Sequence, residues 1–234
     1  MDIDNATLQL PLEQRSWAVR YARPRHEWIL SADIGQSVDP TAICALEHIV
    51  RTTGRLIPDE KARVLRQERI EAFNVRHLER LKLGMSYPEQ IQRVATLHAR
   101  PPLDTATLVI DYTGVGRPVF DMFERAGLEP NGVLITAGNE TTQHGGNIWH
   151  VPKLTLISQL EARLHSGELK IASNIADGDA LKDELKDFKR KVSEAGRVTY
   201  DARSGAHDDL VLAVAIALFV ALNRNDVEIS KLGI

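Results

Sequence analysis

The 234-residue chain has little of what several specialised classes of protein need. It holds one cysteine, Cys44, so it forms no intramolecular disulfide, and no group of cysteines and histidines has the spacing of a zinc site. Aromatic residues make up only 5% of the chain, which argues against a stacking platform for single-stranded nucleic acid. The longest uncharged apolar run, residues 210–222, is shorter than the roughly 20 residues that span a bilayer, and the N-terminus is polar and acidic. We therefore expect an intracellular protein with no membrane span and no export signal.

An excess of one charge is also missing. The formal net charge is -3, with 43% hydrophobic and 26% charged residues, as in an ordinary globular protein. DNA binding would therefore have to come from a local patch. Residues 51–100 hold eleven basic and six acidic side chains, which predicts a phosphate-facing patch that includes Arg76 and Arg80. Local ion pairs on a solvated surface are the alternative.

The hydrophobic pattern predicts strands first, and then alternating helices and strands. We expect strands at residues 28–35, 41–50, 69–81, 107–111, 132–136 and 169–172, and helices at residues 87–98, 119–126, 153–165, 181–192 and 208–222. The last helix is apolar all round, which is typical of a buried helix. The pattern indicates an α/β domain with a mixed sheet.

The predicted domain has simple boundaries. It spans residues 28–223, between an N-terminal arm or linker at residues 1–27 and a C-terminal tail at residues 224–234. Residues 136–150 are rich in glycine and carry two histidines, so we expect a long mobile loop there.

Acidic residues recur where predicted elements begin or end. Asp33 and Asp111 each close a strand just before a glycine-containing turn, and Asp208 and Asp209 open the last helix. If these carboxylates converge, they offer the oxygen ligands that Mg²⁺ or Mn²⁺ prefers, and two such ions support phosphodiester hydrolysis. Each acid also has an ordinary structural explanation, as a turn residue, a helix cap or a partner of the helix dipole. Their coincidence favours the metal site.

In this order, the motifs resemble the nuclease domain of the large terminase subunit of tailed bacteriophages. They are DIGQSVDPTA at residues 33–42, VIDYTGVG at 109–116, VPK at 151–153 and HDDLVLA at 207–213. The resemblance implies a ribonuclease H-like fold, in which helices flank a mixed sheet and the C-terminal helix is buried. It also implies a metal-dependent DNA endonuclease that cuts phage DNA concatemers during genome packaging, in the cytoplasm of the bacterial host.

The resemblance further implies roles for single residues. Asp33 and Asp111 would be catalytic ligands of a two-ion Mg²⁺ or Mn²⁺ site, with Asp209 as the third ligand and Asp208 in reserve. Successive helical residues diverge by about 100°, so both are not expected to face one site. Lys153 matches a basic position that could face the scissile phosphate, although a lysine at a helix start is commonly solvated. The implied partners are double-stranded DNA, a packaging ATPase, and a portal or small terminase subunit.

One departure from full-length terminase subunits bears on function. The chain has no G-x-x-x-x-G-K-S/T phosphate loop, so we expect that it does not translocate DNA by itself. Two other functions stay open. A non-catalytic packaging-complex or DNA-binding module would bind DNA in a salt-sensitive way without cutting it. A phosphotransferase of the actin and sugar-kinase superfold, suggested by the turns at residues 33–35 and 111–116, would bind ATP.

Overall fold

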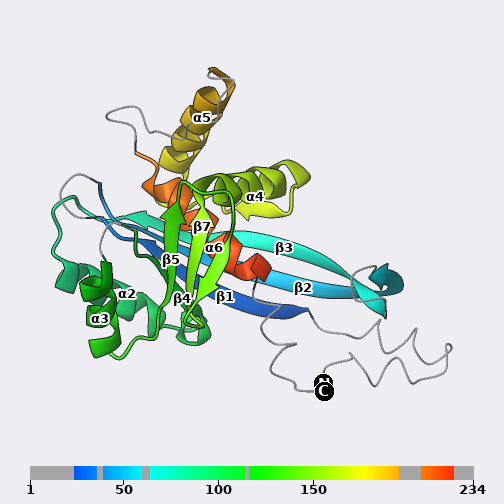
Figure 1. Cartoon of the computed structure of the whole chain (residues 1–234), viewed down its shortest axis with the longest axis horizontal. Helices are drawn as coiled ribbons and strands as arrows, with labels where there is room; N and C mark the ends of the chain where they lie inside the picture. The colour runs from blue at the N-terminus through cyan, green and yellow to red at the C-terminus, as the bar shows by residue number, and fades with distance from the viewer. Residues whose placement is uncertain (1–23, 36–38, 60–63, 114–115, 195–206, 224–234) are drawn as a thin grey trace. The chain divides into compact units, whose positions relative to one another are not determined.

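The computed structural model describes residues 24–35, 39–59, 64–113, 116–194 and 207–223, and its strands form one mixed sheet (Figure 1). The strands are β1 (Arg25–Asp33), β2 (Ala42–Asp59), β3 (Val64–Arg80), β4 (Thr107–Asp111), β5 (Asn131–Thr136), β6 (Thr142–His144), β7 (Ile148–Pro152) and β8 (Leu169–Ile171). The eight strands lie in the order β6-β7-β5-β4-β1-β2-β3-β8. β1 and β4, β4 and β5, β5 and β7, and β3 and β8 pair in parallel, whereas β6 and β7 are antiparallel. The predicted α/β class with a mixed sheet is confirmed.

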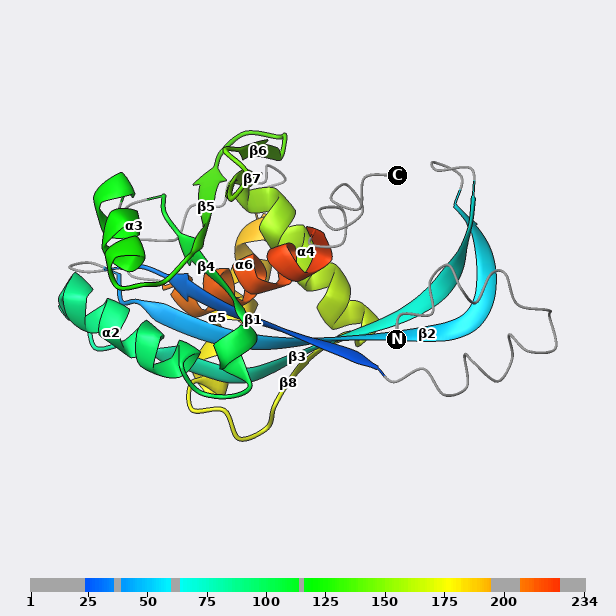
Figure 2. The same ribbon diagram turned by 90° about the horizontal axis from the view of Figure 1, so that it is seen from below.

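Helices cover both faces of this sheet (Figures 1 and 2). One face packs against α2 (Tyr87–His98) and α3 (Gly116–Arg125), and the other against α4 (Lys153–Ser166), α5 (Gly178–Glu194) and α6 (Asp209–Asn223). A 3-10 turn, η2 (Leu103–Thr105), precedes β4. None of the helices in the described part is long and apolar enough to cross a membrane.

The chain forms two compact units, and β2 and β3 contribute to both. Of the described residues, the smaller unit comprises 24–27, 48–59 and 64–72, and the larger comprises 28–35, 39–47, 73–113, 116–194 and 207–223. In the smaller unit the buried His48 lies between two glutamates, with Nδ1 3.6 Å from Glu27 Oε2 and Nε2 3.7 Å from Glu71 Oε2. Burial lowers the pKa of His48, but the two glutamates outweigh this effect, and the net shift is upward.

Residues 1–23 and 224–234 lie outside the described residues, so the predicted arm and tail stay predictions.

The central strands β1 and β4 alternate between the two faces of the sheet. Ile29 and Ser31 on β1, and Val109 on β4, face the core that contains α6, whereas their immediate neighbours face α2 and α3. By the same alternation, Asp33 and Asp111 at the ends of these strands face the α6 side. The Ser31 hydroxyl donates a 2.7 Å hydrogen bond to the Ala213 carbonyl of α6, which ties the central strand to this helix.

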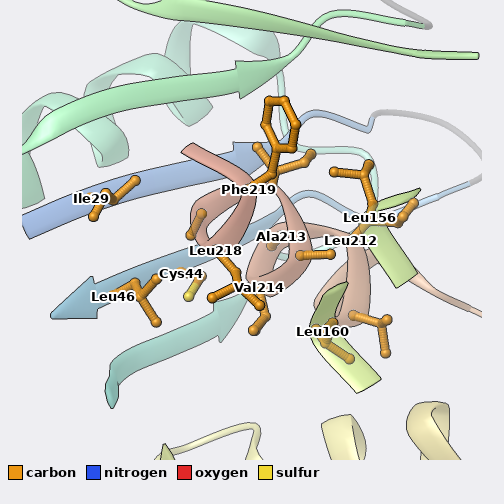
Figure 3. Close-up of a cluster of buried hydrophobic side chains, with 14 of the residues drawn as sticks. Ile29, Cys44, Leu46, Leu156, Leu160, Leu212, Ala213, Val214, Leu218 and Phe219 are labelled. Carbon is orange, nitrogen blue, oxygen red and sulfur yellow. The ribbon is translucent and has the colours of Figure 1, made fainter. Parts of the chain in front are cut away.

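Helix α6 is buried on all sides, as its apolar sequence predicts. Every residue from Asp209 to Ala221 is buried. The helix packs among β1, β2, β3 and α4, with Phe219, Leu218, Val214 and Ala213 in the cluster that Figure 3 shows. Phe219 also meets the ring of Trp149 edge-on, at a centroid distance of 5.6 Å. Small and aliphatic side chains on every face let the helix be enclosed without burying unpaired polar groups.

Every predicted strand and helix has a counterpart in the structure, but one prediction is wrong. Residues 136–150 do not form one long loop, because β6 and the start of β7 pair there as an antiparallel hairpin. The chain turns at Gly145 and Gly146, both at positive φ, which glycine adopts without steric cost. The polar residues of β6 are exposed, so this strand has no hydrophobic alternation that a sequence pattern could detect. In addition, β2 and β3 run further than predicted, to Asp59 and from Val64.

Candidate functional site

Asp33 and Asp111 stand directly opposite each other. They close the adjacent parallel strands β1 and β4, and the strand register pairs them residue for residue. Since both side chains project to the α6 side, two carboxylates share one position at the carboxyl ends of the central strands. In open α/β sheets this edge is where ligands bind. The structure thus brings together the two acids that the sequence analysis singled out first.

The backbone beyond Asp33 is held by a buried hydrogen-bond network. Gln90 of α2 donates from Nε2 to the Gly35 carbonyl at 2.8 Å, and its Oε1 accepts from the Thr41 hydroxyl at 2.8 Å. The Gly35 amide in turn donates to Thr41 Oγ1 at 3.0 Å. A side chain at position 35 would collide with the Asp39 carbonyl, so this close approach requires glycine. The glycine of the first motif therefore has a structural reason.

Thr113 orients the carboxylate of Asp111. The Thr113 hydroxyl and amide both donate to Asp111 Oδ1, at 2.5 and 2.8 Å. Thr113 is itself fixed, since its hydroxyl accepts a 2.7 Å hydrogen bond from the Ile135 amide of β5. One oxygen of Asp111, Oδ1, is therefore held by its own turn.

The paired acids have pKa values above the usual range for aspartate. Burial raises the pKa of Asp33 most, and the charges of Asp111, Asp208 and Asp209 raise it further, in that order, whereas Lys153 lowers it. Burial also raises the pKa of Asp111, and this outweighs the lowering by Thr113, Asp33 and Lys153. The acidic side chains gathered here outnumber the nearby lysine. A divalent cation would offset the repulsion between their carboxylates.

The two aspartates at the start of α6 have different partners. Asp208 Oδ2 accepts from Lys153 Nζ at 2.6 Å, and this lysine opens α4. Asp209 is bound by Arg80 at the end of β3, with Nε 2.7 Å from Oδ2 and Nη2 3.4 Å from Oδ1. Both aspartates raise the pKa of Asp33, Asp208 more than Asp209.

Glu184 on α5 joins this network, and the sequence analysis missed it. Its Oε1 pairs with Arg80 Nη2, and its Oε2 accepts from the Val211 amide at 3.0 Å. Burial raises the pKa of Glu184, and the charge of Asp209 raises it further. The hydrogen bond from Val211 and the charge of Arg80 lower it, and the resulting pKa is about 7. The alternating charges of this helix are typical of a solvent-facing helix, but Glu184 follows Leu181 by three residues, which places it on the buried stripe of α5. That spacing was the available signal.

Arg76 and Arg80 are engaged within the protein. Arg76 pairs with Glu47 through Nε at 2.7 Å and Nη2 at 2.5 Å, and Arg80 pairs with Asp209 and Glu184. On the same strand, Glu79 pairs with Arg93 through two hydrogen bonds. These contacts are those of the alternative in which the arginines form local ion pairs. The phosphate-facing patch stays a prediction.

The donor set at the ends of β1 and β4 fits a hard divalent cation, since it consists of carboxylate oxygens. Within the described residues, however, no group of three or more His, Cys, Asp or Glu side chains is already arranged around one metal position. The contacts explain this, because Asp208 is directed to Lys153 and Asp209 to Arg80. Asp33 and Asp111 would hold such an ion, and a third carboxylate would have to exchange its basic partner for it.

Comparison with known proteins identifies the fold. No protein-family model matches the sequence, and no curated protein matches it. Among solved structures, the large terminase nuclease of thermophilic phage G20c with bound magnesium is 21% identical, with a TM-score of 0.52 over 84% of this chain and 82% of that chain. A second structure of that nuclease is 20% identical, with a TM-score of 0.47 over 83% and 82% of the two chains. The human cytomegalovirus terminase nuclease domain is 13% identical, with a TM-score of 0.42 over 93% and 98%. The first of these likenesses shows that the chain has the ribonuclease H-like α/β fold of a large terminase nuclease domain.

Proposed function

We propose that this chain is a divalent-metal-dependent endonuclease of the terminase type, which cuts double-stranded phage DNA concatemers during packaging. The observation that supports it most is the register of β1 and β4, which sets Asp33 opposite Asp111 at the edge of a sheet with a terminase nuclease fold. A neighbour of the same fold is described with bound magnesium. The proposed cofactor is a pair of Mg²⁺ or Mn²⁺ ions, and the proposed partners are a packaging ATPase and a portal or small terminase subunit.

The third carboxylate comes from the start of α6. The resemblance assigns it to Asp209, but the contacts favour Asp208, because Asp209 is buried and bound through both oxygens by Arg80. Asp208 is partly exposed, and its partner Lys153 also acts on the charges of Asp33 and Asp111. We therefore place Asp208 ahead of Asp209 as a ligand, with Lys153 as the group that faces the scissile phosphate once Asp208 turns to the metal.

The chemistry needs little else from the chain. When bound, such ions supply an activated water and stabilise charge on the leaving oxygen. The residues of the chain would hold and orient these ions. Asp33 and Asp111 present carboxylate oxygens from rigid strand ends, and Thr113 keeps Asp111 in one rotamer. Acids on a sheet with buried anchors position the ions more precisely than acids on loops would.

Cleavage of supercoiled plasmid tests this function. We expect the purified chain to nick or cut plasmid in Mg²⁺ or Mn²⁺ and to be inactive in EDTA. Asp111→Asn and Asp208→Asn should each lower the rate by more than about 100-fold, because even changes to groups that only orient metal ligands typically cost about 10–100-fold. Asp209→Asn should cost less than Asp208→Asn, and the exposed Asp104, with Asp104→Asn, serves as the matched control.

Three outcomes would contradict parts of this proposal. Salt-sensitive DNA binding without cleavage in either metal would indicate the non-catalytic packaging module. Heat of ATP binding in calorimetry would indicate the phosphotransferase. A larger loss with Asp209→Asn than with Asp208→Asn would return the third ligand to Asp209.

Thr113 gives a second prediction for the same site. Thr113→Val keeps the shape of the side chain but removes the hydroxyl that donates to Asp111 and accepts from Ile135. We expect a loss of about 10-fold or more in kcat, since Asp111 is then free to rotate. Thr113→Ser restores the hydroxyl and should retain most of the rate. Equal rates for Thr113→Val and wild type would show that the backbone amide alone orients Asp111.

A further inference from the structure

We infer that Arg80 and Glu184 are positioning residues for the acid site: they fix the first turn of α6 and thereby the direction in which Asp208 faces Asp33 and Asp111. This inference rests on the proposed function and adds two residues that act through others. Arg80, Glu184 and Asp209 are called the clamp below.

Arg80 is anchored at both its backbone and its side chain. Its amide donates to Asp177 Oδ2 at 2.8 Å, so the end of β3 is bound to the segment that precedes α5. Its guanidinium reaches Asp209 through two nitrogens and Glu184 through one of them. The planar fork of arginine fits such a double contact, which a lysine ammonium cannot reproduce. One side chain therefore connects β3, α5 and α6.

Glu184 contributes a second restraint at the same helix end. The first amides of a helix have no partner within the helix, and a side chain from elsewhere must satisfy them when they are buried. Glu184 Oε2 accepts from the Val211 amide in this first turn, at 3.0 Å. The carboxylate therefore caps α6 from a helix that is 27 residues away in the sequence. Arg80 and Glu184 hold both the side chain and the backbone of this turn.

Stability alone does not explain the clamp. Its two carboxylates are buried and share one guanidinium. Buried ion pairs of this kind contribute little to stability compared with apolar packing of the same volume. What the clamp does provide is geometry, because it defines where α6 starts and how it is rotated.

This rotation decides which aspartate meets the sheet edge. Successive residues on a helix point about 100° apart, so with Asp209 held against Arg80 its neighbour Asp208 points elsewhere. Asp208 binds Lys153, which opens α4 directly after β7. If the clamp is released, α6 can rotate or fray at its first turn, and the direction of the Asp208 side chain is no longer set.

Three variants test the clamp, and a neighbouring ion pair supplies the control. Arg80→Met removes the guanidinium, and Glu184→Met removes both the charge and the cap. Glu184→Gln keeps one oxygen that can still accept from the Val211 amide, and it loses the charge that pairs with Arg80. Arg93→Met is the matched control, since it removes the two-bond pair with Glu79, the residue next to Arg80, on the α2 side of the sheet.

Metal binding and amide exchange are measured on variants that retain the wild-type circular dichroism spectrum. We expect Arg80→Met and Glu184→Met to bind Mn²⁺ at least about 10-fold more weakly in calorimetry and to lose kcat with little change in KM for DNA. The Val211 amide should exchange at least about 10-fold faster in Glu184→Met, whereas Glu184→Gln and Arg93→Met should resemble wild type. If Arg80→Met fails to fold, Arg80→Lys replaces it and should lie between wild type and Glu184→Met.

The results separate this inference from its alternatives. Mn²⁺ affinity and Val211 exchange within two-fold of wild type in the folded Met variants would overturn the clamp. A higher KM for DNA with a smaller salt dependence in Arg80→Met, at unchanged Mn²⁺ affinity, would overturn it in favour of a phosphate contact. If wild type neither binds Mn²⁺ nor cuts DNA, the proposed function fails, while the exchange of the Val211 amide still decides whether the clamp holds α6.

Discussion

Asp33→Asn is expected to abolish metal-dependent cleavage and, at the same time, to stabilise the metal-free protein. The wild-type carboxylate is partly buried beside Asp111, Asp208 and Asp209, and these surroundings raise its pKa well above the usual range. At neutral pH its ionised form therefore costs folding free energy, which a neutral amide of the same shape does not. We expect the free energy of unfolding of the metal-free protein to rise at pH 7, because the amide removes the cost of ionising a buried carboxyl group.

The sign of the pH dependence follows from the same shift. A carboxyl group whose pKa is higher in the folded than in the unfolded protein holds its proton longer when folded, so stability falls as pH rises past the unfolded value near 4. Metal-free wild type should therefore lose stability as pH rises above about 4. Asp33→Asn should show a weaker decline, because the side chain at position 33 then no longer ionises.

Thermal melts with and without Mg²⁺ measure both effects. Wild type should gain stability with the metal, by about 2.7 kcal/mol at 100 times the dissociation constant, and Asp33→Asn should gain almost nothing. Asp104→Asn is again the control and should follow wild type in both series. If metal-free Asp33→Asn is less stable than wild type, this prediction is wrong. The Asp33 carboxylate would then stabilise the fold as a hydrogen-bond partner, and its ionisation would not cost folding free energy.

Phe219→Ala is expected to cost about 3–5 kcal/mol of the free energy of unfolding, because it leaves a cavity inside the most enclosed helix. Phe219 is 1% exposed, contacts Trp149 edge-on and lies in the core shown in Figure 3. The surrounding side chains come from different strands and helices, so they cannot all move to fill the space.

Urea denaturation followed by circular dichroism checks this loss. Phe219→Leu retains most of the buried volume and should cost clearly less than the alanine variant. Leu83 is 51% exposed, so Leu83→Ala should change stability by no more than about 0.5 kcal/mol. A cost below about 1 kcal/mol for Phe219→Ala would mean that α6 is loosely packed, and the precise placement of Asp208 would then need another cause than the rigidity of the core.

Much of the fold could be predicted because its signals are local. Continuous apolar runs mark β1 and β4, and the run from Leu210 marks α6 as buried, since such sequences are stable only inside a core. The hairpin of β6 and β7 was not predictable in this way. Its strands are held by pairing with each other and with β5, and exposed residues such as Gln143 leave no periodic pattern.

For the site, the sequence indicated the acids but not their arrangement. Asp33 and Asp111 could be found because each follows a strand and precedes glycine. Arg80 was expected to face DNA phosphates, yet it lies against Asp209 and Glu184. Nothing in the order of residues along the chain reveals that a side chain at position 80 meets two acids more than 100 positions later.

The sequence by itself determined the α/β class, the burial of α6, and the presence of carboxylates at element ends, because backbone preference and hydrophobic periodicity act over a few neighbouring residues. Only the tertiary structure decided that Asp33 stands opposite Asp111, that Asp208 pairs with Lys153 while Asp209 pairs with Arg80, and that Glu184 caps α6. Those pairings depend on strand register and helix rotation, which are set by the packing of distant segments. Charge and geometry at the site are therefore properties of the folded chain as a whole.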